Sequence, residues 1–270
     1  MSLGSMLFML LYYLGYSLRV LLNYQDFFSI SFLDVDQGDS IVLHTKEGKT
    51  VVVDGGGNYI ASSKLASKFL MNKCTIDHIF ITHEHFDHLG GIPRILQYCE
   101  VSSITFNDVN CFSRTCNSIR TYTKPKKIFK GDTFLFNELY IETLWPTERY
   151  TNVGSDNPNG ASLVLFVDYG DFEALLTGDA ESHILDNIDI SSILPRVQGR
   201  FDVYKAPHHG ARNGLSTVLL DQLRPEHCVI PVGDDNSYGH PHKETLEYFE
   251  KIGCSIHRTD LDGDIEFRVR

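Results

Sequence analysis

The amino-acid sequence predicts an α/β fold in which two mixed β-sheets pack face to face and helices cover their outer faces, an αββα sandwich. Short apolar, β-branched segments come first as hairpin strands and then alternate with helical segments in each half of the chain. Clusters of polar residues directly follow apolar strands, where α/β folds place their chemistry. With 270 residues and 42% hydrophobic content, the chain can bury one large core, and we expect one domain over 25–270.

The first half of the chain predicts a sheet rich in hairpins, followed by helices. Its short apolar runs are separated by turn sequences such as Asp34-Val35-Asp36-Gln37-Gly38-Asp39. A helix near residue 91 carries Pro93 in its first turn, where a proline is tolerated. The expected elements are strands at 27–33, 40–44, 50–53 and 77–82, helices at 62–71 and 91–98, and strands at 104–106, around Ile128, at 134–136 and at 139–144.

The second half alternates strands with helices. A hairpin turns at Tyr169-Gly170-Asp171 and delivers Thr177-Gly178-Asp179 at its end, and a later strand ends in Pro207-His208-His209-Gly210. The expected elements are hairpin strands at 162–168 and 172–176, a helix at 180–187, a strand at 203–206, a helix at 216–223, a strand at 228–232, a helix at 243–252 and a closing pair of strands.

Residues 1–24 form an apolar segment that we expect to be a membrane-associated helix, either interfacial or the end of a membrane segment. Residues 6–18 carry no charge, but about 13 residues fall short of the roughly 20 that a full span needs. Tyr12, Tyr13 and Tyr16 suit a membrane interface. The segment lacks the basic start and cleavage site of a signal peptide. The alternatives are a core helix and a wrongly assigned start codon.

The net charge of −11 argues against non-specific binding of nucleic acid over the whole surface, because such binding uses clustered Lys and Arg. Acidic metal ligands are neutralised by the ions they bind, so the formal charge overstates repulsion near a metal site. The basic cluster over 124–130 is the best candidate for contact with a polyanion, although such loops are more often solvated surface. The candidate phosphate contacts are Lys124, Lys126, Lys127 and Arg212.

The cysteines form no Cys-x-x-Cys pair and no dense framework of the kind that small secreted domains use. We therefore expect buried free thiols. Cys111 and Cys116 are the pair that could form a disulfide if their loop faces an oxidising space. The six positions are 74, 99, 111, 116, 228 and 254.

One motif predicts a metal centre. His83, His85, Asp87 and His88 fall within six residues, directly after an apolar strand. Imidazole nitrogen and carboxylate oxygen are ligands for zinc-like or manganese-like ions, and alternate positions in an extended turn can face two centres. Burying such a cluster without ions costs several kcal/mol unless every group is paired. These four residues are therefore the expected ligands.

Further candidate ligands come from distant strands. Asp179 follows an apolar strand and can bridge two ions, and His208 and His209 can complete the second centre. With His240 and His242, the chain has more candidate ligands than two ions require. A histidine beside the ions but not bound to them would donate a proton to a leaving oxygen or contact a substrate phosphate. The catalytic candidates are Asp87, His208, His209 and His240.

The ordered set of motifs resembles the metallo-β-lactamase superfamily, and is most similar to the soluble nuclease-like domain of ComEC/Rec2 competence proteins. The matching pieces cover the chain from about residue 28 to its end, in order. They are the histidine motif with Gly90-Gly91, Phe32-Leu33-Asp34-Val35-Asp36-Gln37-Gly38-Asp39-Ser40, Val53-Asp54-Gly55-Gly56, Ser162-Leu163-Val164-Leu165, Leu176-Thr177-Gly178-Asp179, His208-His209-Gly210, Tyr238-Gly239-His240-Pro241-His242 and Arg258-Thr259-Asp260.

The resemblance implies a metallo-β-lactamase-like domain with a defined ligand set. His83 and His85 would bind one ion, Asp87 and His88 the other, and Asp179 both. His208 or His209 would complete the second centre, although other branches of the superfamily point to His240. Asp54 matches an acid that supports the metal loop. The other residues expected behind the ligands or against the substrate are Asp39, Asn159, Ser162 and His242.

This chain departs from the family pattern at three places. The competence proteins mostly have Gly at the position of Asp36 and commonly Asp at the position of His85. Many superfamily members supply a histidine between the first cluster and the bridging acid, where this chain has Asp156, Asn157 and Asn159 before Ser162. A weakly held first ion would favour manganese over tightly bound zinc.

The function that the resemblance implies is that of a metal-dependent phosphodiesterase or nuclease acting on DNA, linked to DNA uptake in competence. Two divalent ions, Zn²⁺ or Mn²⁺, would activate a hydroxide that attacks phosphorus. We expect DNA as substrate, membrane DNA-uptake proteins as partners, and attachment to the membrane through residues 1–24. The catalytic domain would lie outside the cytoplasm or, alternatively, within it.

Two other functions fit the same residues, because a fold does not fix a substrate. One is a metallo-hydrolase of a small-molecule or cell-wall ester, similar to a phosphorylcholine esterase or a lactonase. The other is a metal-stabilised binding module without catalysis. An open groove over the metal centre would favour DNA, and a narrow pocket would favour a small ester.

Overall fold

The computed structural model describes residues 27–68, 73–107, 111–152, 157–197 and 199–270, together with five isolated positions before residue 14. The expected membrane-associated helix over 1–24 and its boundary at residue 25 fall outside the continuously described ranges. Among the described residues, no helix combines the length and the apolar character that crossing a bilayer requires.

The first sheet joins the N-terminal strands to the last strand of the chain, in the order β15-β1-β2-β3-β5-β7. The pairs from β15 to β3 are antiparallel, and β3, β5 and β7 run parallel. Phe28 pairs with Val269, so the C-terminal strand completes the sheet. The strands are β1 (Phe28–Phe32), β2 (Ile41–His44), β3 (Thr50–Val53), β5 (His78–Ile81), β7 (Ile104–Phe106) and β15 (Ile265–Val269).

The second sheet has the order β14-β13-β12-β11-β10-β9-β8. Strands β8 to β11 are antiparallel, and β11 to β14 are parallel. A separate short pair joins β4 (Thr75–Ile76) to β6 (Glu100–Val101). The strands of the second sheet are β8 (Thr133–Phe136), β9 (Leu139–Trp145), β10 (Val164–Tyr169), β11 (Phe172–Leu176), β12 (Val203–Lys205), β13 (His227–Ile230) and β14 (Ser255–Arg258).

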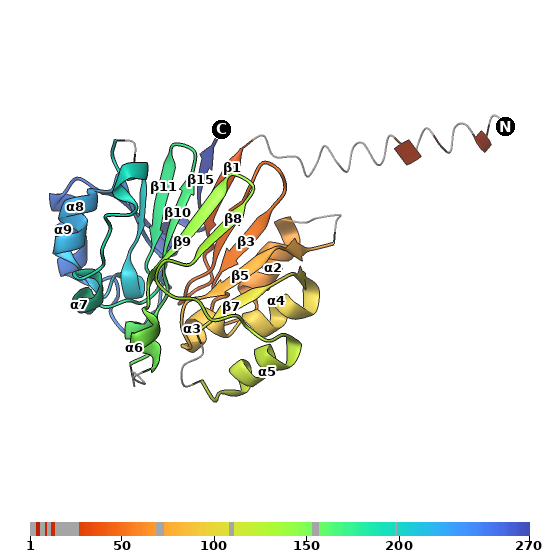
Figure 1. The fold of residues 1–270 in the computed structure, drawn as a ribbon, viewed down its shortest axis with the longest axis horizontal. Coiled ribbons are helices and arrows are strands. Elements are labelled where there is room, and N and C mark those ends of the chain that lie inside the picture. Colours follow the sequence, from red (N-terminus) through yellow and green to blue (C-terminus); the bar gives the residue numbers. More distant parts are fainter. Residues whose placement is uncertain are drawn as a thin grey trace.

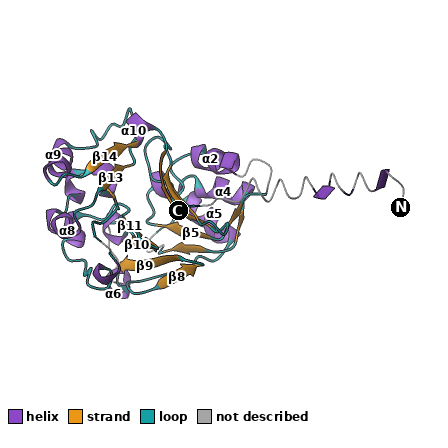
Figure 2. Ribbon diagram, turned by 90° about the horizontal axis from the view of Figure 1, so that it is seen from above, coloured by secondary structure: helices purple, strands orange, loops and turns teal. Residues whose placement is uncertain are grey.

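Helices cover the outer face of each sheet (Figures 1 and 2). Figure 1 shows α2, α4 and α5 beside the first sheet and α7, α8 and α9 beside the second. The helices are α2 (Ile60–Lys68), α3 (Phe86–Leu89), α4 (Ile92–Tyr98), α5 (Arg114–Tyr122), α6 (Glu148–Asn152), α7 (Ser182–Leu185), α8 (Thr217–Leu223), α9 (Lys243–Lys251) and α10 (Thr259–Asp262).

The strands are apolar on both faces because each sheet is buried on both sides. In β3, Val51 and Val53 enter the core between the sheets, and Val52 packs under the helices. In β10, Leu165 faces the inter-sheet core and Phe166 the helical layer. Successive side chains of a strand point to opposite faces, and both faces here are covered. The αββα class predicted from the sequence is confirmed.

Several elements differ from those expected. The sequence reasoning missed α3, α5, α6 and α10, and Ile128 lies in no strand. Helix α5 was missed because it is mostly polar and buries only Cys116 and Ile119, with Ser113 accepting a hydrogen bond from its first turn at 3.1 Å. The two closing strands do not pair, because β14 adds to the second sheet and β15 to the first.

The expectation of free thiols is wrong, because all six cysteines form disulfides. Cys111, just before α5, pairs with Cys116 in the first turn of that helix. The other two bonds are Cys74–Cys99 and Cys228–Cys254, which span 25 and 26 positions of the sequence. Spacing could not predict them, because the partners are brought together only when the parallel strands and their crossover helices have formed.

Removing a long-range disulfide will lower stability. We expect Cys228→Ala/Cys254→Ala to lose about 3 kcal/mol of unfolding free energy in urea, because a closed loop of this size restricts the unfolded chain. Cys111→Ala/Cys116→Ala is the matched control and should lose less, because its loop is short. Six titratable thiols in the unreduced, unfolded protein would contradict the assignment.

Candidate metal centre

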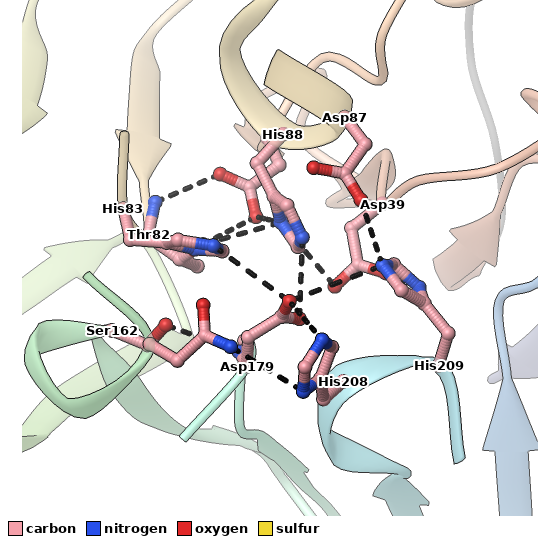
Figure 3. Close-up of polar contacts among 12 residues, drawn as sticks. Asp39, Thr82, His83, Asp87, His88, Ser162, Asp179, His208 and His209 are labelled. Carbon is pink, nitrogen blue, oxygen red and sulfur yellow. Dashed lines mark hydrogen bonds and ion pairs between the residues drawn. The ribbon is translucent and has the colours of Figure 1, made fainter. Parts of the chain in front are cut away.

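Residues from separate motifs meet where strands of the two sheets end (Figure 3). His83 and His88 follow β5, and Asp179 follows β11. Two backbone hydrogen bonds fix these ends: Leu163 N–H donates to the Thr82 carbonyl at 3.0 Å, and His208 N–H to the Gly178 carbonyl at 3.2 Å. The site therefore lies at the carboxyl ends of parallel strands, where α/β folds bind ligands.

Three imidazoles present the same ring atom to the carboxylate of Asp179. Nε2 of His88 is 3.2 Å from Asp179 Oδ1, and Nε2 of His83 and of His208 are 3.7 and 3.8 Å from Oδ2. The backbone N–H of Asp179 donates to Ser162 Oγ at 3.1 Å. Asp179 is thus held at the centre of the cluster in Figure 3.

Asp54 orients two of these rings from behind. Its carboxylate accepts the Thr82 N–H at 2.8 Å, the Thr82 hydroxyl at 2.7 Å and the His88 Nδ1–H at 2.8 Å. The Thr82 hydroxyl oxygen lies 3.1 Å from His83 Nδ1 and accepts its N–H. Because Nδ1 is hydrogen-bonded in both rings, each ring is turned so that Nε2 faces Asp179. Metal-binding histidines are commonly oriented in this way.

Lys205 lies fully buried beneath the cluster. Its ammonium pairs with Asp39, donates to the Gly178 carbonyl at 2.8 Å and lies 3.9 Å from Asp179 Oδ1. A buried carboxylate is costly unless it is paired. Lys205 therefore compensates the charge of Asp39 and ties it to the turn that carries Asp179.

His209 joins Asp39 to Asp87. Its Nδ1–H donates to the Pro231 carbonyl at 2.9 Å and is 3.4 Å from Asp39 Oδ1. Its Nε2 is 3.1 Å from Asp87 Oδ2 and 4.0 Å from Asp179 Oδ2. The side chain is 1% exposed. His209 therefore presents Nε2 to the cluster while its other nitrogen is fixed by the backbone.

The pKa values reflect this concentration of charge. Burial alone would lower the pKa of His88, but the surrounding carboxylates, led by Asp179, raise it well above the usual imidazole value. Burial would also lower the pKa of His209, but Asp179 and the other carboxylates raise it to about 9. Burial would raise the pKa of Asp179, but His88 and the neighbouring histidines hold it well below its ordinary value.

The backbone is strained at the same residues. Asp54, His208 and His209 have φ values of 61°, 51° and 54°, in the left-handed region that few residues other than Gly adopt. Gly38 has φ 136°, and a Cβ there would lie 2.1 Å from the Asp87 carbonyl oxygen. Strain of this kind persists where the surrounding structure requires it, commonly at functional sites.

The cluster fits a divalent metal. Among the described residues, two groups have ligand atoms within 4.8 Å of one another: Asp39, His88 and His209, and His83, His88 and Asp179. Buried ligand atoms of this set have no hydrogen-bond partner, namely His83 Nε2, His88 Nε2, Asp39 Oδ1 and Asp179 Oδ1. Orphaned buried polar atoms require an explanation, and zinc or manganese accepts these donors.

An open cavity of about 370 Å³ lies over the cluster. The His85 ring stands on its wall, with its centroid 4.7 Å from that of His83, and Asp87 is partly exposed there. The residues lining it are Gln37, His85, Phe86, Asp87, Asn159, Asp179, His208, His209, Tyr238 and His240.

The remaining predicted residues lie in different places. The amide nitrogen of Asn159 is 3.3 Å from His208 Nδ1. His240 stands on the cavity wall, where burial and His208 lower its pKa to about 4. His242 does not line the cavity. It directly precedes α9, and its Nδ1 accepts the Arg212 backbone N–H at 3.2 Å.

Sequence reasoning missed Lys205 and Thr82 as members of the site. A signal for Lys205 was present, because it is the one charged residue in the buried stretch Val203-Tyr204-Lys205-Ala206. Lysine is almost never fully buried unless it is paired. Its partner Asp39 lies 166 positions away in the sequence, so only the structure reveals the pair.

The chain matches the family model of the metallo-beta-lactamase superfamily over residues 33–233. It is 34% identical to competence protein ComA of Neisseria gonorrhoeae over 247 residues, 88% of this chain and 32% of that protein. It is 28% identical to recombination protein 2 of Haemophilus influenzae (87% and 28%) and 24% identical to ComE operon protein 3 of Bacillus subtilis (89% and 33%). The chain thus spans about a third of the length of these relatives.

Solved structures share the fold at low sequence identity. Tm1679, a metal-dependent hydrolase of the beta-lactamase superfamily, aligns with a TM-score of 0.59 and 17% identity over 90% of this chain and 99% of that one. The Zn²⁺-bound PqqB of Methylobacterium extorquens aligns with a TM-score of 0.53 and 11% identity (86% and 87%). The diiron β-hydroxylase CmlA of Streptomyces venezuelae aligns at 0.58 and 14% (90% and 54%).

Metal affinity will rise with pH. In the metal-free protein, His209 stays protonated up to about pH 9, and an ion can bind only its neutral ring. We expect calorimetric titration with Zn²⁺ to show tighter binding and proton release as pH rises from 6.5 towards 9. Over the same window the metal-free protein loses the stability that protonated His209 contributes, because its folded pKa is raised. An affinity independent of pH would contradict this arrangement.

Lys205→Met will destabilise the metal-free protein by about 3–5 kcal/mol, because it leaves Asp39 buried without its cation. The measurement is the free energy of unfolding in urea. Lys49→Met is the matched control, because Lys49 pairs with Asp77 at 2.8 Å on the surface and should matter by at most about 1 kcal/mol. Equal effects of the two substitutions would show that the buried pair is not needed.

Proposed function

Because the chain belongs to the metallo-β-lactamase superfamily, we propose that it is a metal-dependent phosphodiesterase or nuclease that cleaves DNA. One observation carries the proposal: Nε2 of His83 and His88 and Oδ1 of Asp39 and Asp179 are buried without hydrogen-bond partners in one cluster. Asp179 of this cluster lines an open cavity. The two ligand groups overlap at His88 and form one continuous cluster, which suits a pair of adjacent ions with the Asp179 carboxylate between them.

The residues divide into ligands and supports. His83, His85 and Asp179 would hold one ion, and Asp87, His88, His209 and Asp179 the other, with Asp39 beside the second. Bound ions supply Lewis acidity, which polarises a phosphoryl oxygen and lowers the pKa of water. Asp54 and Lys205 stand behind the ligands, where they fix ring orientation and the position of Asp39.

His208 is the best-placed residue to contact the leaving oxygen. Its side chain is 25% exposed, whereas that of His209 is 1% exposed. The Asn159 amide N–H donates to His208 Nδ1, so the neutral ring carries its proton on Nε2, and the ring lines the cavity beside Asp179. His240 stands nearby with a pKa lowered to about 4, so near neutral pH its ring accepts or donates hydrogen bonds without charge.

The names of the relatives favour DNA as substrate. A competence protein and a recombination protein each match nearly nine-tenths of this chain. A role in DNA uptake, with membrane DNA-uptake proteins as partners, follows as a proposal from these names. The basic residues that the sequence offers for phosphate contact, Lys124, Lys126, Lys127 and Arg212, do not line the cavity.

The disulfides favour a location outside the cytoplasm. Three disulfides in one domain are typical of oxidising compartments, whereas cytosolic thiols are kept reduced. We therefore propose that the catalytic domain is extracytoplasmic and that residues 1–24 associate with the membrane.

A small ester is the second candidate substrate. The cavity volume of about 370 Å³ is near the lower end of the range for small-molecule pockets, about 300–1,000 Å³. This size would also admit the headgroup of a cell-wall ester or a lactone.

Asp179→Asn will abolish metal-dependent cleavage of DNA, with a fall of at least about 100-fold, because loss of a supporting residue alone costs about 10–100-fold. The measurement compares single-stranded DNA, duplex DNA and a simple phosphodiester, with Mn²⁺ and Zn²⁺. Asp171→Asn is the control, because Asp171 is exposed at the turn between β10 and β11, at the opposite end of β11 from Asp179.

If only the simple phosphodiester is cleaved, the nuclease proposal is wrong and the protein is a hydrolase of small substrates. Bound metal with no turnover of any ester would replace it by a binding module.

A further inference from the structure

Two exposed aromatic rings stand on the wall of the metal cavity. Phe86 is 64% exposed and Tyr238 is 66% exposed, and both line the cavity with Asp179 and His208. Phe86 begins α3, and Tyr238 lies in the loop between β13 and α9. Large aromatic side chains normally gain free energy by burial, so two that face solvent beside a reactive centre need an explanation.

The Phe86 ring is supported on one side by backbone. An ideal Cβ on Gly57 would lie 3.5 Å from Phe86 Cδ1, and one on Gly90 would lie 2.9 Å from Phe86 Cε2. The ring therefore packs against two residues that have no side chain, and most of its surface remains available. Phe86 also sits between His85 and Asp87, so its position is fixed by the metal loop.

The Tyr238 ring is supported by His240 and by a braced loop. The two rings stack with centroids 5.6 Å apart and an interplanar angle of 23°. The Asn236 amide donates to the Gly233 and His240 carbonyls at 2.9 and 2.8 Å, and its oxygen accepts the His240 N–H at 2.9 Å. The loop thus holds Tyr238 in place before any ligand binds.

The cavity offers little else to hold a nucleotide strand. No Lys or Arg is among its described lining residues, and the nearby Arg212 pairs with Glu244 at 2.9 Å. The chain as a whole carries a net charge of −11. Phosphate contacts by cationic side chains, which dominate most nucleic-acid binding, are therefore missing from this cavity.

We propose that Phe86 and Tyr238 are stacking platforms for unpaired nucleobases, so that the substrate of this site is single-stranded DNA. Aromatic side chains bind single strands through the π-faces of successive bases, with little dependence on sequence. The bases of a duplex are paired and stacked on one another and cannot reach such rings without unpairing. This inference rests on the proposed function, and it specifies the substrate and the residues that position it.

The test compares two single-stranded oligonucleotides with the same phosphorothioate backbone, one with bases and one abasic throughout. Dissociation constants are measured by fluorescence anisotropy with the Mn²⁺-loaded full chain. We expect the parent to bind the base-bearing strand at least about 5-fold more tightly, the effect of stacking one base. The dissociation constant of the abasic strand divided by that of the base-bearing strand is the base ratio. This ratio should not change with salt, because both strands carry the same phosphate charge.

Variants assign the effect to the two rings. Tyr238→Leu and Phe86→Leu should each move the ratio towards one, and Tyr238→Trp should preserve it. Tyr98→Leu is the matched control, because Tyr98 is 56% exposed at the end of α4 and does not line the cavity. Mn²⁺ titration of each variant checks that the adjacent ligands still bind; where Phe86→Leu alters that binding, the Tyr238 variants carry the test.

A ratio of one in the parent, or a ratio that both Leu variants retain, would overturn the stacking proposal. If the parent protein cleaves DNA but binds both strands equally, the proposed nuclease function stands and only the stacking role of the two rings is rejected. If the preference for the base-bearing strand depends on Phe86 and Tyr238 but no strand is cleaved, the stacking role is supported and the nuclease function is rejected.

Discussion

The structure depends on burying three carboxylates where the ends of the two sheets meet. Asp39, Asp54 and Asp179 are each at most 1% exposed, and a buried carboxylate is costly unless it is paired or hydrogen-bonded. Lys205 compensates Asp39, and Thr82 with His88 satisfies Asp54. Asp179 is left facing imidazole edges with one oxygen unsatisfied. The arrangement that stabilises the end of the sandwich is therefore also the one that presents ligand atoms for a cation.

Most of the fold could be predicted because its signals are local. Short apolar runs rich in β-branched residues between turns predict strands such as β3 and β10. Because these strands are apolar on both faces, they predict sheets that are covered on both sides. The failures needed non-local information. Helix α5 has a weak apolar face, the last strand joins β1 across the whole chain, and disulfide partners meet only in the folded sheets.

Part of the candidate site also follows from local signals. Three histidines and an acid in one short motif predict a metal loop, and the place of Asp179 after an apolar strand predicts that it joins them. Sequence could not separate His208 from His209, because adjacent left-handed residues send one ring into the buried cluster and the other to the cavity. Nor could it join Lys205 to Asp39, or bring Phe86 and Tyr238 to the same cavity, because these residues come from distant elements.

The two ligand groups that overlap at His88 bind a pair of divalent ions on either side of the Asp179 carboxylate if the proposed function is right. The most direct measurement is anomalous X-ray diffraction from crystals of the Mn²⁺-loaded protein. We expect two anomalous peaks within coordinating distance of the Asp179 carboxylate, one beside His83 and one beside His209. No anomalous peak in the cluster, or an ion bound only elsewhere on the protein, would contradict this expectation.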